Sequence, residues 1–308
     1  MKHLPLIRYA ILLIVSINIS FQSFAQKENT FKSPDFNYPQ TVIENADAML
    51  AKALKRGDGE AVALALIQSS LAKSSISEDS LPSILSSIDN IIKIEKDKNI
   101  KSILLVLEAK IITDYYQDNR YTLSQRVSID TAVDNINNIF EWNELQFKIK
   151  ISTLLDSALS NKELISTPVT TYPELIIINS ISIDTYPTLY DFITYQAIDN
   201  YNKMGAAYYW NPFAKSSNND VDIHEKVLNL YDNIIALHTE DAPRIKAILN
   251  KMEFSKENSL ENIEALYQQY NHSVYSAPII LEIVKRSNDE KKNYNILISF
   301  LEKFPNRG

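Results

Sequence analysis

The chain has 308 residues, 45% of them apolar, and a formal net charge of −7, so it can bury a sizeable core but lacks the basic surplus that nucleic acids and anionic membranes attract. It contains no cysteine, which excludes disulfides, thiolate metal sites, a thioester and a lipid-modified cysteine. Its 4 glycines, where average usage would give about 22, allow no pattern of a phosphate-binding loop or a nucleophile elbow.

The N-terminus has the pattern of a secretory signal peptide over residues 1–25. Lys2 and Arg8 precede an apolar run, and the small residues Ser23 and Ala25 precede Gln26. The alternative, an N-terminal membrane anchor, needs roughly 20 apolar residues, and the run has only about 11. The sequence therefore predicts a periplasmic or extracellular protein that is not lipid-anchored and has no membrane span.

A polar leader precedes the first helices. Residues 26–40 carry two prolines among mostly polar side chains, so we expect an extended leader there. Helical periodicity then takes over. Stretches over residues 42–55 and 60–73 flank Gly57 and are predicted to form a helix pair.

The clearest helix follows residue 80. Ser80 is placed as its N-cap and Pro82 in its first turn, where the missing N–H of proline does no harm. Its apolar residues repeat on one face, at Leu81, Ile84, Leu85, Ile88, Ile91 and Ile92. A helix over residues 100–116 is expected to pair with it, so residues 41–166 form a first helical-repeat segment.

Three longer stretches interrupt the helical pattern, at residues 117–130, 167–186 and 204–219. We predict that residues 167–186 form an irregular connector between two helical segments. Residues 175–178 could pass for a strand, but an isolated strand has nothing to pair with, so we interpret them as a buried extended connector.

The last of these stretches contains a dense aromatic cluster of Tyr208, Tyr209, Trp210 and Phe213. Buried aromatic side chains dominate protein interfaces, so these residues are candidates for contact with a partner protein. The simpler interpretation is a loop that plugs the gap between helix pairs.

Residues 187–308 are predicted to form a second helical-repeat segment. Short apolar stripes follow one another there, starting at Ile223, Ile245, Ile263, Ile279 and Tyr294. Helices that are apolar on one side bury their stripes by packing as antiparallel neighbours. The sequence therefore predicts an all-α fold, a TPR-like α-solenoid of antiparallel helix pairs with a few long irregular connectors, although no strict repeat period is present.

The histidines give no pattern for catalysis or metal binding. Residues 218–225 group aspartates with His224, but they lack the glycine and glutamate of a calcium-binding loop and the second histidine of a zinc protease. We interpret those aspartates as helix caps. His238 and His272 stand alone, so we do not expect a serine–histidine–aspartate assembly.

Carboxylate pairs of the kind that glycosidases use are not singled out by the sequence. Asp114 and Asp118 would bring like charges together on a helix, but we expect the helix to end before Asp118. We therefore predict no catalytic, cofactor-binding or metal-binding residue.

A set of motifs resembles the N-terminal region of large α2-macroglobulin-like proteins of the Bacteroidota type. In chain order, the motifs lie at residues 114–120, 186–192, 228–238 and 266–270, and the most specific is the proline-led helix start at Pro187-Thr188-Leu189-Tyr190-Asp191. The resemblance implies a TPR-like array that precedes a series of macroglobulin β-sandwich domains. Those domains trap proteases, and this chain has neither their bait segment nor their Cys-x-Glu-Gln thioester.

These observations favour an exported, non-catalytic scaffold or protein-interaction module whose partners are proteins. We interpret it as a truncated or split relative of that protease-inhibitor family. The alternative is a freestanding, secreted peptide- or protein-binding α-solenoid. A glycan-active enzyme with an α/α fold is a third hypothesis, and it predicts a deep acidic cleft.

Overall fold

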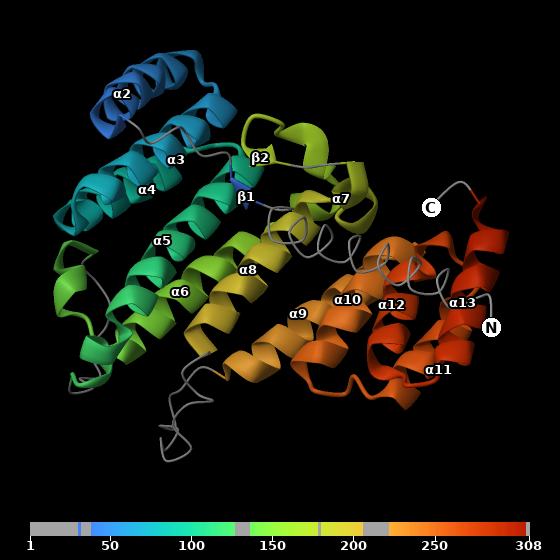
Figure 1. Ribbon diagram of the computed structural model, residues 1–308. Helices are drawn as coiled ribbons and strands as arrows, with labels where there is room; N and C mark the ends of the chain where they lie inside the picture. Colours follow the sequence, from blue (N-terminus) through green and yellow to red (C-terminus); the bar gives the residue numbers. More distant parts are fainter. Residues whose placement is uncertain (1–29, 32–37, 127–135, 178–179, 206–221, 306–308) are drawn as a thin grey trace. The chain divides into compact units, whose positions relative to one another are not determined.

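The computed structural model describes residues 30–31, 38–126, 136–177, 180–205 and 222–305, and these residues are mostly helical (Figure 1). They form two compact units. The first extends to Ile183 and adds Thr188–Ile193, and the second consists of Asp184–Pro187 and the chain from Thr194 onward. The predicted signal peptide, residues 1–25, lies outside the described residues. The predicted division of the chain into a leader, a connector and two helical-repeat segments stays a prediction.

The first unit is built around one long helix. Its α-helices are α2 (Pro39–Arg56), α3 (Gly59–Ile76), α4 (Leu81–Ile94), α5 (Lys98–Ser124) and α6 (Glu144–Leu159). Helix α5 contacts α3, α4 and α6, and α2 packs on α3. Short 3-10 helices accompany them, at η1 (Glu78–Ser80), η2 (Ile136–Glu141), η3 (Lys162–Ser166) and η4 (Val169–Thr171).

The helix predicted after residue 80 is confirmed as α4. All six residues of its predicted stripe are buried, and Pro82 lies in its first turn. Ser80 is the N-cap residue by position, but its hydroxyl donates to the carbonyl oxygen of Ser77 at 2.6 Å and does not cap the helix. The apolar stripe, together with the proline, therefore determines where this helix begins.

Gly57 closes the predicted first helix pair. It follows Arg56 at the end of α2 and adopts φ +65°, a left-handed conformation that costs other residues roughly 1 kcal/mol. Asp58 then caps α3, accepting the backbone N–H of Ala61 at 3.1 Å. The chain thus reverses direction within a few residues, through the end of α2, the left-handed glycine and the cap of α3.

Helix α5 is longer than its sequence predicts. It continues through residues 117–124, where we expected an interruption, so Asp118 lies inside the helix and not beyond its end. Asp114 forms an ion pair with Lys110 one turn earlier, which offsets the expected like-charge repulsion. Before this extension, Tyr115 stacks with Phe147 of α6 at 5.8 Å between ring centroids, and just after the helix end Arg126 Nη1 donates to the carbonyl oxygen of Trp142 at 2.6 Å.

The strand that we dismissed in the connector has a partner. Thr30–Phe31 (β1) pairs antiparallel with Ile176–Ile177 (β2), so the interpretation of an unpaired extended segment was wrong. The partner comes from the leader, far away in sequence, which local patterning cannot reveal. The connector also contains a short helix, α7 (Ser180–Thr185), ahead of α8 (Leu189–Gly205).

Side-chain hydrogen bonds hold the residues after α6 against the start of α5. Asn161 Nδ2 donates to Asn99 Oδ1, and Asn99 Nδ2 donates to Thr167 Oγ1, each at 3.0 Å. The Tyr172 hydroxyl donates to Asp97 Oδ2 at 3.2 Å. This segment is therefore an ordered part of the first unit.

The second unit consists mainly of consecutive helices with short connections. After the C-terminal part of α8 come α9 (Ile223–Leu237), α10 (Asp241–Phe254), α11 (Leu260–Tyr270), η5 (Val274–Ser276), α12 (Ala277–Arg286) and α13 (Glu290–Lys303). Neighbours along the chain pack together, α9 with α10, α11 with α12 and α12 with α13. Among the described residues, no helix has the length and apolar character needed to cross a bilayer.

Candidate functional site

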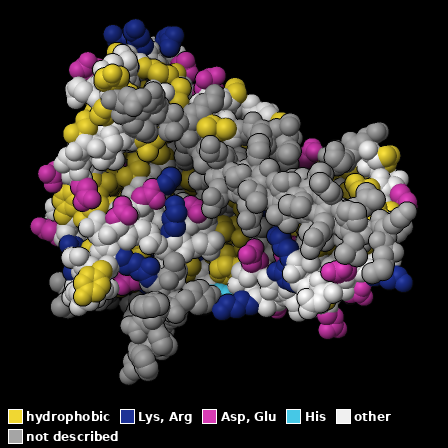
Figure 2. All heavy atoms as spheres, viewed as in Figure 1, with side chains coloured by type: hydrophobic (Ala, Val, Ile, Leu, Met, Phe, Trp, Pro, Cys, Tyr) yellow, Lys and Arg dark blue, Asp and Glu magenta, His cyan; other side chains and the backbone are white. Residues whose placement is uncertain are grey.

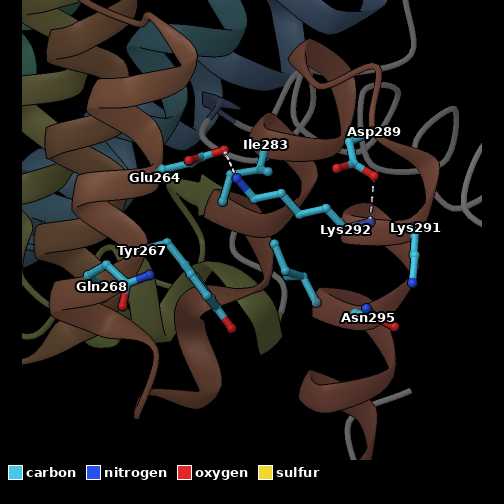
Figure 3. Close-up of a pocket in the computed structure, with 9 residues that line it drawn as sticks. Glu264, Tyr267, Gln268, Ile283, Asp289, Lys291, Lys292 and Asn295 are labelled. Atoms are coloured by element: carbon cyan, nitrogen blue, oxygen red, sulfur yellow. Dashed lines mark hydrogen bonds and ion pairs between the residues drawn. The ribbon is translucent and has the colours of Figure 1, made fainter.

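The last three helices of the second unit surround a surface pocket of about 480 Å³. Helix α12 lies behind it and contacts both α11 and α13, which supply the two walls (Figure 3). We call this pocket the α11–α13 groove. It is lined by Glu264, Tyr267, Gln268, Ile283, Asp289, Lys291, Lys292, Asn295 and Ile296.

The floor of the groove rests on a hydrophobic core. Ile283 of α12 is fully buried and belongs to the same cluster as Ile263 and Leu266 of α11. Tyr267 and Ile296 are partly buried against that cluster, from α11 and α13 respectively. The same apolar stripes that fold these helices therefore give the groove a preformed apolar floor.

Two polar contacts tie the walls together. Lys292 Nζ reaches from α13 to Glu264 Oε1 of α11 at 2.6 Å, as Figure 3 shows. Lys303 Nζ, near the end of α13, donates to the carbonyl oxygen of Asn271 at 3.1 Å. The first contact joins two lining residues of the groove, and the second lies beyond Ile296, the last lining residue of α13.

The two carboxylates of the rim already have partners. Glu264 is paired with Lys292, and Asp289 Oδ1 accepts the backbone N–H of Lys292 at 2.9 Å as the N-cap of α13. Lys291 also lines the groove, is exposed, and makes no ion pair within the described ranges. With Glu264, Asp289, Lys291 and Lys292, the rim carries two negative and two positive charges, and one of each forms the ion pair between Glu264 and Lys292.

Three uncharged polar groups also face the groove. The side chains of Gln268 on α11 and Asn295 on α13 make no hydrogen bond to another residue of the described chain. The ring of Tyr267 extends from α11 into the space between the walls (Figure 3), and partial burial raises the pKa of its hydroxyl above the usual value. The hydroxyl therefore stays protonated at neutral pH and, like the two amides, can donate a hydrogen bond.

The candidate contact residues Tyr208, Tyr209, Trp210 and Phe213 lie outside the described residues. Their role in partner contact stays a prediction.

The acidic segment at residues 218–225 forms a helix cap where it is described. Asp222 Oδ1 accepts the backbone N–H of Glu225 at 3.0 Å and caps α9, as we predicted for the aspartates of this segment. His224 is exposed and stacks on Phe254, with 4.9 Å between the ring centroids. These contacts explain the segment through helix formation and packing.

The other two histidines of the described residues, His238 and His272, each lie near one carboxylate. His238 is buried with Nδ1 3.8 Å from Glu240 Oε2, and the Nε2 of His272 is 3.7 Å from Asp241 Oδ2. Within the described ranges, no three His, Cys, Asp or Glu side chains form a group that could hold a metal ion.

One buried carboxylate stands out in the first unit. Glu108 of α5 has no exposed surface, and Lys150 Nζ of α6 lies 3.0 Å from its Oε1. Burial raises the pKa of Glu108 above its usual value, and Lys150 limits the rise. Because a fully buried group cannot touch a substrate, we assign this pair to the packing of α5 on α6.

Sequence reasoning missed both the groove and the buried pair. Gln268, Lys291 and Asn295 look like ordinary solvent-facing residues of amphipathic helices. Glu108 interrupts the apolar face of its helix, between Leu107 and Ala109. That interruption was the one feature of the sequence that could have indicated a buried ion pair. Finding the partner of either site requires knowing which helices are neighbours.

Comparisons with known proteins leave the chain without an assigned family. No protein-family model, no curated protein and no solved structure matches it.

Proposed function

We propose that the chain is a non-catalytic protein-interaction module that holds a short segment of a partner protein in the α11–α13 groove. One observation carries the proposal: an apolar floor is combined with the side-chain amides of Gln268 and Asn295, whose hydrogen-bonding capacity is unused among the described residues. Binding sites in proteins characteristically combine an apolar surface with a few polar groups in this way.

The helix order supports an α-solenoid as the scaffold of this module. Consecutive helices pack on one another from α9 to α13, apart from the step between α10 and α11, where η5 contacts both helices. Arrays of stacked helix pairs build elongated surfaces on which partner proteins bind. The proposed fold is thus the TPR-like solenoid expected from the sequence.

A protein partner fits the surface better than a nucleic acid does. In Figure 2, the Lys and Arg side chains on the visible face are interspersed with Asp and Glu side chains. The chain as a whole carries a formal net charge of −7. A nucleic acid backbone is held chiefly by neutralising its phosphates, which favours a continuous basic surface.

The resemblance to α2-macroglobulin-like proteins suggests where such a module operates. We propose an exported scaffold related to the helical front of those protease-trapping proteins, with its partner in the same compartment. Mass spectrometry of the protein expressed with its N-terminus intact tests export. A mature chain that begins at Gln26 is expected, and a secreted chain that retains residues 1–25 would contradict the signal peptide.

The proposed function predicts peptides whose binding depends on the groove. We expect a displayed library of random seven-residue peptides, selected on the wild-type chain, to yield binders that lose at least about tenfold in affinity on a Gln268→Ala/Asn295→Ala variant. Losing two hydrogen-bonding side chains accounts for a loss of that size. Fluorescence anisotropy with synthetic copies of the selected peptides measures it.

Asn229→Ala is the matched control, since Asn229 is an exposed asparagine in the interior of α9. Its affinity for the selected peptides should equal that of the wild type, and circular dichroism should show full helicity for every variant. The proposed function would be rejected if the selection enriched no peptides, or if the selected peptides bound the double variant with the same affinity as the wild type.

A further inference from the structure

We infer that α13 pairs with α13 of a second copy of this chain, with the two helices antiparallel about a twofold axis. The contact uses one side of the helix, which we call the α13 outer face and which consists of Lys291, Tyr294, Ile298, Leu301 and Glu302. This inference goes beyond the groove and does not depend on a peptide ligand. Two features lead to it, an exposed apolar stripe and a pair of opposite charges at its ends.

The apolar stripe of the outer face is separate from the side of α13 that packs on the rest of the unit. Phe300 is the buried residue of α13 and marks the inner side. Tyr294 and Leu301 lie about two helical turns apart and are 47% and 45% exposed, and Ile298 lies between them and is partly buried. The helix therefore has a second apolar side that is available for packing against another helix.

The two charges flank this stripe. Lys291 and Glu302 are both exposed, and neither forms an ion pair with another residue of the described ranges. They lie about three helical turns apart, so they fall on the same side of α13. In Figure 3, the side chain of Lys291 extends away from α11, whereas Lys292 reaches across to Glu264.

Opposite charges at the two ends make the outer face complementary to itself. In an antiparallel pair, Lys291 of each copy lies beside the partner's Glu302, and Tyr294 lies beside the partner's Leu301. A parallel pair would place like charges together. A twofold contact of this kind forms both ion pairs at once, so the charges favour a second copy of the chain as the occupant.

Sedimentation velocity over a range of protein concentrations tests the inference. A single helix pair is a small interface, so we expect a reversible equilibrium between monomer and dimer. Lys291→Glu and Glu302→Lys should each weaken the dimer at least about tenfold, because both symmetric ion pairs become repulsive. Lys52→Glu, at an exposed lysine of α2, is the matched control and should leave the equilibrium unchanged.

Neither charge change should destabilise α13 itself. Lys291 lies in the first turn and Glu302 in the last turn of the helix. The helix dipole favours a negative charge in the first turn and a positive charge in the last. Weaker dimerisation of either variant, with circular dichroism unchanged, therefore reports on the contact between copies.

Mixing the two single variants tests the pairing directly. One variant carries two negative charges on the outer face and the other two positive charges, so an equimolar mixture should form a heterodimer as strong as the wild-type dimer. The Lys291→Glu/Glu302→Lys double variant should also recover wild-type affinity. A wild-type chain that stays monomeric up to a few hundred micromolar, or a dimer that ignores both single variants, would overturn the inference. Because no peptide is present, either result leaves the proposed function of the groove intact.

Discussion

Replacing Lys150 by methionine is expected to lower the free energy of unfolding by about 3 kcal/mol at pH 7, because it leaves the charge of Glu108 buried without its partner. Glu108 has no exposed surface, and about a quarter of the Lys150 side chain, 23%, reaches solvent. The ammonium group can be hydrated when it is unpaired, whereas the carboxylate cannot. Urea denaturation monitored by circular dichroism measures the loss.

The pH dependence of this loss identifies its cause. The folded protein raises the pKa of Glu108 above its usual value of 4.5, so protonated Glu108 favours the folded state. The stability contributed by this group is fully present below its unfolded pKa and is lost as the pH rises through the raised value. Without Lys150 the pKa rises further, so the destabilisation by Lys150→Met should shrink by more than half between pH 7 and pH 4.

Two further variants separate this effect from general disruption of packing. Lys110→Met removes an ion pair with Asp114 that is partly exposed, and it should cost less than about 0.5 kcal/mol. A Lys150→Met/Glu108→Leu double variant should recover most of the lost stability, since no buried charge remains. A loss that is the same at pH 4 and pH 7, and that the double variant does not repair, would contradict the assignment.

Truncating Phe147 to alanine is expected to cost about 4 kcal/mol, the largest effect of a single apolar substitution that we predict. Phe147 is fully buried in α6, and its ring lies 5.3 Å from that of Trp142 and 5.8 Å from those of Tyr115 and Tyr116, measured between centroids. Removing the ring opens a cavity at the contact between α5 and α6.

The fluorescence of Trp142 reports on this site directly. The chain has two tryptophans, so a Trp210→Phe background leaves Trp142 as the single reporter of unfolding in the first unit. Tyr121→Ala, at an aromatic residue of α5 that is 83% exposed, serves as the control and should cost less than about 0.5 kcal/mol. A cost below about 1 kcal/mol for Phe147→Ala would mean that α6 does not pack on α5 as described.

Local features of the sequence were sufficient to predict most helices. The stripe from Leu81 to Ile92 required nothing beyond spacing, and Asp222 and Ser259 cap α9 and α11 through their own side chains. These interactions span only a few residues, so periodicity and capping rules capture them. The exact end of α5 escaped prediction because a contact next to it, the hydrogen bond from Arg126 to the carbonyl oxygen of Trp142, involves a residue from later in the chain.

Contacts between distant segments could not be predicted in the same way. The pairing of Thr30 with Ile177, the ion pair of Glu108 with Lys150 and the link from Lys292 to Glu264 each join residues from different elements. Apart from Glu108, the charged residues of these pairs are unremarkable in their own helices. The candidate site belongs to this class, because a groove is defined by two walls and the sequence presents one wall at a time.

Site-specific photo-crosslinking tests whether a partner segment binds in the α11–α13 groove. A benzophenone amino acid is placed at position 268 or 295, or at position 229 as the control, and the strongest peptide from the library selection is added. We expect crosslinked peptide at positions 268 and 295 and none at position 229. Crosslinking that is absent from both groove positions, or equal at all three, would contradict it.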